Sequence, residues 1–193
     1  NKNIELGIKH IKQAADKGHT LAQFGIGMMY YSGEEGMEQN FTMAEKYLLM
    51  AAKSGNVESQ LTLAYLYRGL DDYNQALYWA RKAAQANNAD SHEFIGMAYL
   101  NGMGVKQDTE EGIKWLESAA EYGSASAQFT LGDILMGSDH GAKVEVDPAR
   151  SFKYLMMAAQ QEHPEAMFCV GLCYSSGKGT PQDNNASMEW IRK

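Results

Sequence analysis

The stretch Ser91 to Gly123, SHEFIGMAYLNGMGVKQDTEEGIKWLESAAEYG, contains two helical patterns joined by a glycine-rich turn. In each half, small and apolar residues recur on one side of a helix with about 100° per residue. They are Ser91, Ile95, Gly96 and Tyr99 in the first half, and Gly112, Trp115, Ala119 and Ala120 in the second. Between them, Asn101-Gly102-Met103-Gly104 ends the first helix, because glycine tolerates the left-handed backbone that closes a helix. The stretch therefore predicts a hairpin of two helices.

The same pattern recurs along all 193 residues. Alanine pairs begin at positions 14, 51, 83, 119 and 158, so that successive pairs lie 32 to 39 residues apart. A small residue precedes an aliphatic residue by four positions in each full repeat, and glycine or alanine follows directly, at Gly27, Ala64, Gly96, Gly132 and Gly171. A period of this length indicates one supersecondary unit per repeat, stacked in a line.

Further positions keep the same spacing. A short acceptor side chain recurs where the second helix of a repeat should begin, as expected of a helix N-cap; these residues are Asn40, Asp108, Asp147 and Asp183. A large aromatic residue recurs on the second helix and is expected to fill the space between repeats, at Tyr47, Trp79, Trp115, Tyr154 and Trp190.

The pattern running from Ser91 through Gly102-x-Gly104-Val105, Asp108 and Trp115 to Gly123 closely resembles the Sel1-like repeat, a relative of the tetratricopeptide repeat. The resemblance implies an all-α, right-handed solenoid of helix pairs that acts as an adaptor or scaffold in protein complexes. In bacteria such proteins are often found at the envelope or in host contact, and in eukaryotes in endoplasmic-reticulum quality control. The sequence itself indicates no compartment.

The repeats predict one array over residues 1–193. A second helix at 1–19 is followed by full repeats at 20–56, 57–88, 89–124 and 125–163 and by a nearly complete repeat at 164–193. Because the array begins and stops inside a repeat, we expect a piece of a longer protein. Two departures are local: the Gly137 to Asp147 loop is long, either a tolerated insertion or a partner-specific feature, and Glu162 replaces the usual helix-ending glycine.

The composition argues against several functions. The formal charge of -7, without a basic cluster, disfavours nucleic acid as the partner, and no apolar run reaches the length of a membrane span. The five histidines are scattered, and Cys169 and Cys173, one helical turn apart, supply at most half a metal site and are interpreted as structural. We expect no catalytic residues, no metal and no cofactor, and a monomer.

One face of the first helices is less polar than solvent exposure alone would predict. Positions two, six and nine after the small residue point away from the second helix. Part of this stripe, Phe24, Leu61, Phe129 and Phe168, is interpreted as packing between neighbouring first helices. The remainder is either core as well or a partner-binding surface on the concave face of the solenoid: Met28, Tyr31, Tyr65, Arg68, Glu93, Met97, Leu100, Asp133, Met136 and Leu172.

Methionine adapts to different ligands and aromatic side chains anchor them, so such a face suits a peptide or a partner helix. The sequence thus predicts a non-enzymatic adaptor or scaffold whose partner is a protein or peptide. The alternative is an auxiliary interaction domain or subunit of a larger enzyme or membrane-associated complex, in quality control, secretion or host contact.

Overall fold

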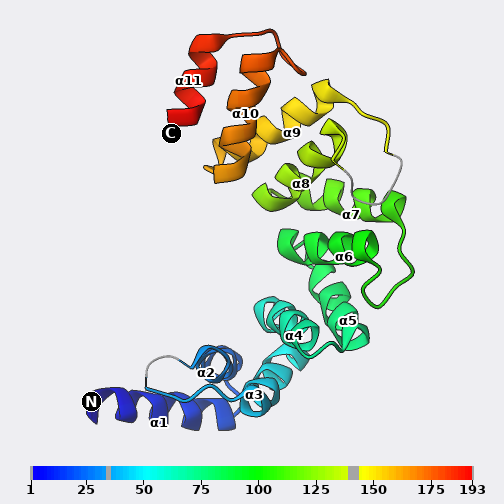
Figure 1. Ribbon diagram of the computed structural model, residues 1–193. Helices are drawn as coiled ribbons and strands as arrows, with labels where there is room; N and C mark the ends of the chain where they lie inside the picture. The colour runs from blue at the N-terminus through cyan, green and yellow to red at the C-terminus, as the bar shows by residue number, and fades with distance from the viewer. Residues whose placement is uncertain (1, 34–35, 139–143, 193) are drawn as a thin grey trace. The chain divides into compact units, whose positions relative to one another are not determined.

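The computed structural model describes residues 2–33, 36–138 and 144–192 (Figure 1). Within these residues all regular secondary structure is helical, which confirms the predicted all-α class. The helices are α1 (Lys2–Asp16), α2 (Thr20–Ser32), α3 (Phe41–Lys53), α4 (Val57–Gly69), α5 (Tyr73–Ala84), α6 (Ala89–Asn101), α7 (Thr109–Glu121), α8 (Ala125–Met136), α9 (Pro148–Gln160), α10 (Pro164–Ser176) and α11 (Asn184–Arg192).

The chain forms two compact units, Asn1–Ala86 and Asn87–Lys193. In unit 1, α1 packs on α2, and the helix pairs are α2 with α3 and α4 with α5. In unit 2, the pairs are α6 with α7, α8 with α9 and α10 with α11 (Figure 1). We call α2, α4, α6, α8 and α10 the first helices and the others the second helices. Both units are thus built from the helical hairpins that the sequence predicts.

Glycine on the first helix lets the second helix approach closely. A Cβ atom added to Gly96 would lie 2.9 Å from Cγ of Leu116 and 3.0 Å from the carbonyl oxygen of Gly112. A Cβ atom on Gly132 would lie 2.6 Å from Cγ of Leu155 in α9, and the Ser151 hydroxyl of the same helix donates a hydrogen bond to the Gly132 carbonyl. The predicted role of these small residues in setting the hairpin geometry is confirmed.

The acceptor residues predicted as N-caps do cap the second helices. Asn40 Oδ1 accepts a hydrogen bond from the Met43 amide at 3.0 Å, and Asp108 does the same for Glu111 at 3.1 Å. Asp147 and Asp183 bond in the same way to the amides of the helices that follow them. These side chains satisfy amides that have no partner within the helix, which fixes where each second helix begins.

The second helices end on residues in the left-handed region. Gly123 has a φ of 98° after α7, and Glu162 takes the equivalent place after α9 with a φ of 61°. A side chain in that conformation is strained, yet the helix pair forms as it does in the other repeats. Of the long loop expected between Gly137 and Asp147, residues 139–143 lie outside the described part of the chain.

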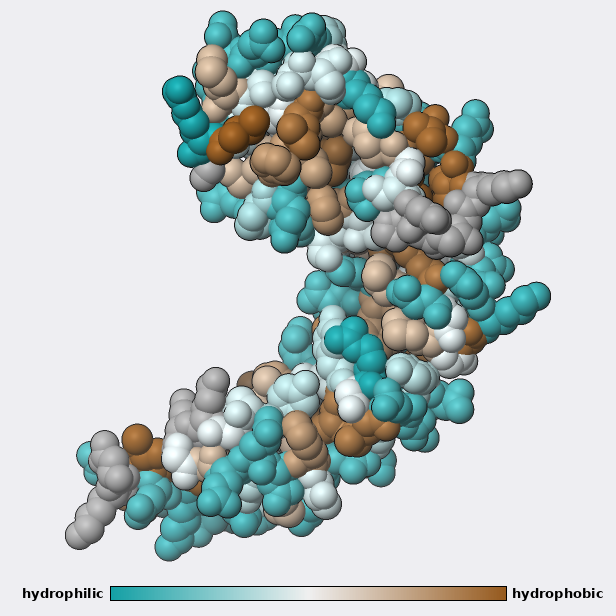
Figure 2. Space-filling view, in the orientation of Figure 1, coloured by the Kyte–Doolittle hydropathy of each residue, from teal (hydrophilic) through white to brown (hydrophobic). Residues whose placement is uncertain are grey.

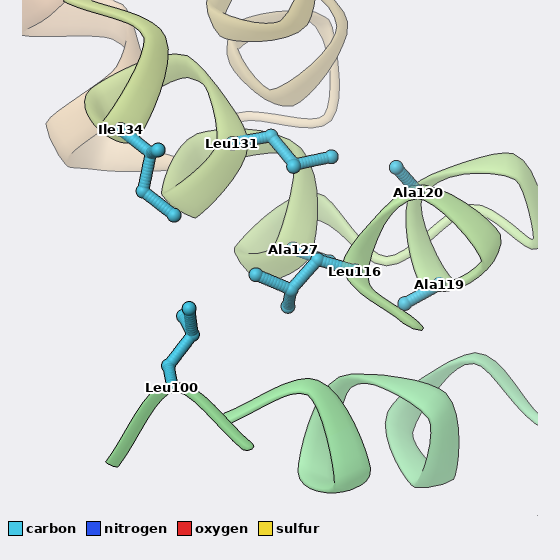
Figure 3. Close-up of a cluster of buried hydrophobic side chains, with 7 residues drawn as sticks. All are labelled: Leu100, Leu116, Ala119, Ala120, Ala127, Leu131 and Ile134. Atoms are coloured by element: carbon cyan, nitrogen blue, oxygen red, sulfur yellow. The ribbon is translucent and has the colours of Figure 1, made fainter. Parts of the chain in front are cut away.

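The core of unit 2 between α6, α7 and α8 is formed by aliphatic side chains (Figure 3). Leu100 points from α6 toward Leu116 and Ile134, and only 3% of its surface is exposed. The expectation that Leu100 lies on an accessible binding face is therefore wrong. The physical reason is Gly112: without a Cβ atom there, α7 leaves room for the Leu100 side chain, which turns inward.

Candidate peptide-binding face

In unit 1, the predicted face residues lie on the two first helices, α2 and α4. The Met28 sulfur accepts a hydrogen bond from the Thr62 hydroxyl at 3.7 Å, so these helices are neighbours. Tyr65 is half-buried and its ring lies 4.9 Å from the Arg68 guanidinium carbon, within the range of a cation–π contact. Tyr31 is also half-buried, with its ring 5.9 Å from that of Phe41. Unit 1 thus presents partly accessible aromatic and thioether groups beside one cation.

In unit 2, the first two predicted residues, Glu93 and Met97, lie on α6. The Glu93 carboxylate accepts hydrogen bonds from the hydroxyls of Ser124 and Ser126, both at 2.6 Å. These bonds tie α6 to the beginning of α8. Met97 is half-buried and packs against the core between α6 and α8. Both side chains therefore have structural contacts, whatever else they bind.

Apart from the buried Leu100, the remaining predicted residues of unit 2 lie around one cavity. Asp133 and Met136 of α8 and Leu172 of α10 line a cavity of about 220 Å³. Leu155 and Cys173 also line it, and Lys178 lies at it as well. The Lys178 ammonium group donates a hydrogen bond to the Met136 carbonyl oxygen at 3.1 Å, which links the end of α8 to the loop after α10.

The surface around this cavity is apolar. Leu172 is 46% exposed, although Val170, Gly171 and Cys173 beside it on α10 are buried. Figure 2 shows hydrophobic side chains gathered on the part of unit 2 that contains α8, α9 and α10. The side chains of α8 and α10 that face one another therefore form an accessible apolar patch with a hollow in it.

The four residues interpreted as packing between first helices behave differently from one another. Leu61 is buried, and Phe24 and Phe129 are half-buried. The Phe129 ring stacks on the His163 ring, with 4.9 Å between their centroids. Phe168 is 53% exposed, so its assignment to the core is wrong. It lies on α10, where no described residue covers it as His163 covers Phe129.

Sequence reasoning missed a recurring glutamine. Gln23, Gln60 and Gln128 follow the small residue of their first helices and are buried. Each donates a hydrogen bond from Nε2 to the carbonyl oxygen of an alanine in the preceding second helix, at 3.1 Å in all three cases. The signal was present as a polar residue repeated at the solenoid period on a face that is otherwise apolar. These glutamines hold α2, α4 and α8 to the second helices that precede them.

Both cysteines lie on α10, beside the cavity. Burial raises the pKa of the Cys169 and Cys173 thiols above the ordinary value, so both are protonated at neutral pH. Within residues 2–33, 36–138 and 144–192, no group of three histidine, cysteine or acidic side chains is arranged to hold a metal ion. In the same part of the chain, no helix is both long and apolar enough to span a bilayer.

Comparison with known proteins identifies the repeats. The profile of the Sel1 repeat matches this chain at residues 1–19, 20–56, 57–88, 89–124, 125–163 and 164–193. This chain belongs to the Sel1 repeat family. The predicted resemblance is therefore confirmed, and with it the solenoid class of the fold.

Two solved structures are similar over nearly the whole chain. The Sel1 repeat protein from Oxalobacter formigenes is 28% identical, with a TM-score of 0.86, and the match covers 96% of this chain and 54% of that one. The protein c5321, a protective antigen of uropathogenic Escherichia coli strains, is also 28% identical, with a TM-score of 0.84 over 97% of this chain and 40% of that one.

Among sequence relatives, the uncharacterized protein NMB1327 of Neisseria meningitidis serogroup B is 22% identical over 218 residues. The match covers 95% of this chain and 44% of the relative. The present chain thus spans roughly half the length of each of these three proteins. Sel1 repeats are generally protein-interaction modules, typically without catalytic activity, and the family assignment names no particular partner.

Proposed function

We propose that this Sel1 repeat array is an adaptor that binds a segment of another protein on its first helices. The observation that carries the proposal is the accessible apolar patch on α8 and α10, formed by side chains at the predicted positions and containing a cavity. Exposed apolar patches with a hollow are typical of surfaces that bind a partner. Family membership supports a protein partner.

The test compares two faces of the same protein. A pull-down with residues 1–193 first identifies what stays bound, and the affinity of that partner is then measured. Leu172→Glu places a charge in the apolar patch and should weaken binding more than tenfold, a loss of at least about 1.4 kcal/mol. Lys114→Glu, a charge change on the exposed side of α7, is the matched control and should leave the affinity within about twofold.

Circular dichroism and thermal unfolding of both variants establish that the fold is retained. Leu172 is 46% exposed, so the substitution removes little from the core. If Leu172→Glu binds as tightly as the original chain while Lys114→Glu loses the partner, the second helices carry the binding surface and the proposal is wrong.

A second function is supported by the length comparison. Because the chain spans roughly half the length of these relatives, it is also suited to be the interaction domain of a larger protein whose activity lies in another domain. The two functions differ in the flanking sequence: a catalytic domain or a membrane anchor next to the array supports the auxiliary role. In both cases the first helices bind the partner.

A further inference from the structure

One core residue that lines the cavity on α8 and α10 is smaller than its counterpart a repeat earlier. Ile134 of α8 and Cys173 of α10 both lie seven positions after the small residue of their helices. Between α6 and α8, Leu100, Leu116 and Ile134 fill the space and are almost fully buried (Figure 3). Between α8 and α10, the corresponding residues are Met136, Leu155 and Cys173, and a hollow of about 220 Å³ remains.

The walls of the hollow select for an apolar group. Met136, Leu155 and Leu172 contribute aliphatic and thioether surface, and the Cys173 thiol is buried and protonated, hence uncharged. Methionine has three rotatable bonds and adjusts to the shape of what it contacts. An apolar side chain that enters gains the free energy of leaving water without displacing any charge.

Two polar groups of opposite character lie at the same hollow. Lys178 donates one hydrogen bond to the Met136 carbonyl, and an ammonium group has three N–H donors in all. The Asp133 carboxylate accepts a hydrogen bond from Ser138 at 2.6 Å, and a carboxylate can accept several hydrogen bonds at once. One donor group and one acceptor group are what the C=O and N–H of an extended peptide require.

We propose that the hollow receives one apolar side chain, such as leucine, from an extended peptide segment whose backbone lies against Lys178 and Asp133. This rests on the proposed function, in which α8 and α10 take part in partner binding, and it specifies the chemistry of the partner. A helical segment fits less well, because its backbone N–H and C=O groups already bond to one another. A leucine in an extended segment satisfies both the apolar walls and the polar pair.

The probe is the tripeptide N-acetyl-Ala-Leu-Ala-amide, with N-acetyl-Ala-Ser-Ala-amide as its control. Binding is followed by NMR of methionine methyl groups in the reduced protein, the Met136 signal being assigned with Met136→Leu. The leucine peptide should shift the Met136 signal in a saturable manner, and the serine peptide should not. Lys178→Gln should weaken binding of the leucine peptide, whereas Lys114→Gln, the control at an exposed side chain of α7, should not.

The decisive variant places isoleucine at position 173, as at the equivalent position 134 of the preceding repeat. Cys173→Ile should narrow the hollow and weaken the leucine peptide at least tenfold, without lowering the thermal unfolding midpoint. Should isoleucine prove too large and unfold the protein, Cys173→Val makes the same test with one methylene fewer.

Three results would overturn the inference: no shift of Met136 up to the solubility limit of the leucine peptide, unchanged binding in a folded Cys173→Ile or Cys173→Val variant, or preference for a helical leucine-bearing peptide over the tripeptide. These results are distinguishable from failure of the proposed function. If the captured partner is lost on Leu172→Glu but kept on Cys173→Ile, the face binds its partner and the hollow plays no part.

Discussion

At the scale of single residues, a glycine controls how closely two helices pack. Gly96→Val introduces a branched side chain where a Cβ atom alone would lie 2.9 Å from Leu116 and 3.0 Å from the Gly112 backbone. The backbone contact cannot be relieved by a rotamer change, so the two helices must separate. We expect a loss of about 1 to 3 kcal/mol in the free energy of unfolding, measured by urea denaturation.

Gly25→Val is the matched control for this substitution. Gly25 also lies within a first helix, but a Cβ atom added there meets nothing within 4 Å. Its replacement should leave stability unchanged or raise it slightly, because glycine is a poor helix former. Equal losses in both variants would mean that the close approach of α6 and α7 at Gly96 does not explain the effect.

Also at this scale, sequence reasoning was strongest where local chemistry decides. Asn40 and Asp108 were predictable as caps because a short acceptor at a helix start satisfies nearby amides. The burial of Leu100 was not predictable in this way. The helical period places Leu100 on the outer stripe, but Gly112 has no Cβ atom and so leaves room for the Leu100 side chain in the core. Whether such a side chain points into the core or toward solvent depends on the residues of the facing helix, and the period of its own helix does not contain them.

At the scale of the helix pair, the residues in contact compensate for one another. Gly27, Gly132 and Gly171 lie against Leu48, Leu155 and Ile191 respectively. The pair formed by α4 and α5 instead has alanine at both corresponding positions, Ala64 and Ala80, and both are fully buried. The other pairs thus place a glycine against a large side chain, whereas the pair of α4 and α5 places a small side chain on each helix.

This compensation predicts a non-additive pair of substitutions. Ala80→Leu alone should overpack the hairpin and cost about 1 to 3 kcal/mol, whereas Ala64→Gly together with Ala80→Leu restores the arrangement of the other repeats. A double-mutant cycle in urea should show that the double variant is more stable than the sum of the single effects predicts, by about 0.5 kcal/mol or more. Additive effects would show that Ala64 and Ala80 do not contact each other as their counterparts do.

The candidate site was also only partly predictable at this scale. The period of the first helices correctly grouped Asp133, Met136 and Leu172, since residues at equal places in successive repeats lie side by side. The hollow between them was not foreseen. Cys173 lines it at the place where the preceding repeat has Ile134, and the sequence predicts only a structural role for the two cysteines.

At the scale of the whole molecule, repetition made the fold predictable and left the partner open. The same spacing recurs often enough that the solenoid class followed from the residues, and the Sel1 repeat profile and the solved relatives agree with it. Core positions are constrained by the packing of each repeat on the next. Binding positions are constrained by a partner that the chain does not contain, so the period can locate a face but cannot name what binds there.

The most direct test of the central claim, that the first helices carry the binding surface, is site-specific photo-cross-linking to the captured partner. A photoreactive benzoylphenylalanine is introduced at position 172 on α10 or at position 114 on α7, both of which carry exposed side chains. The account predicts a covalent adduct with the partner from position 172 and none from position 114. An adduct from position 114, with none from position 172, would contradict it.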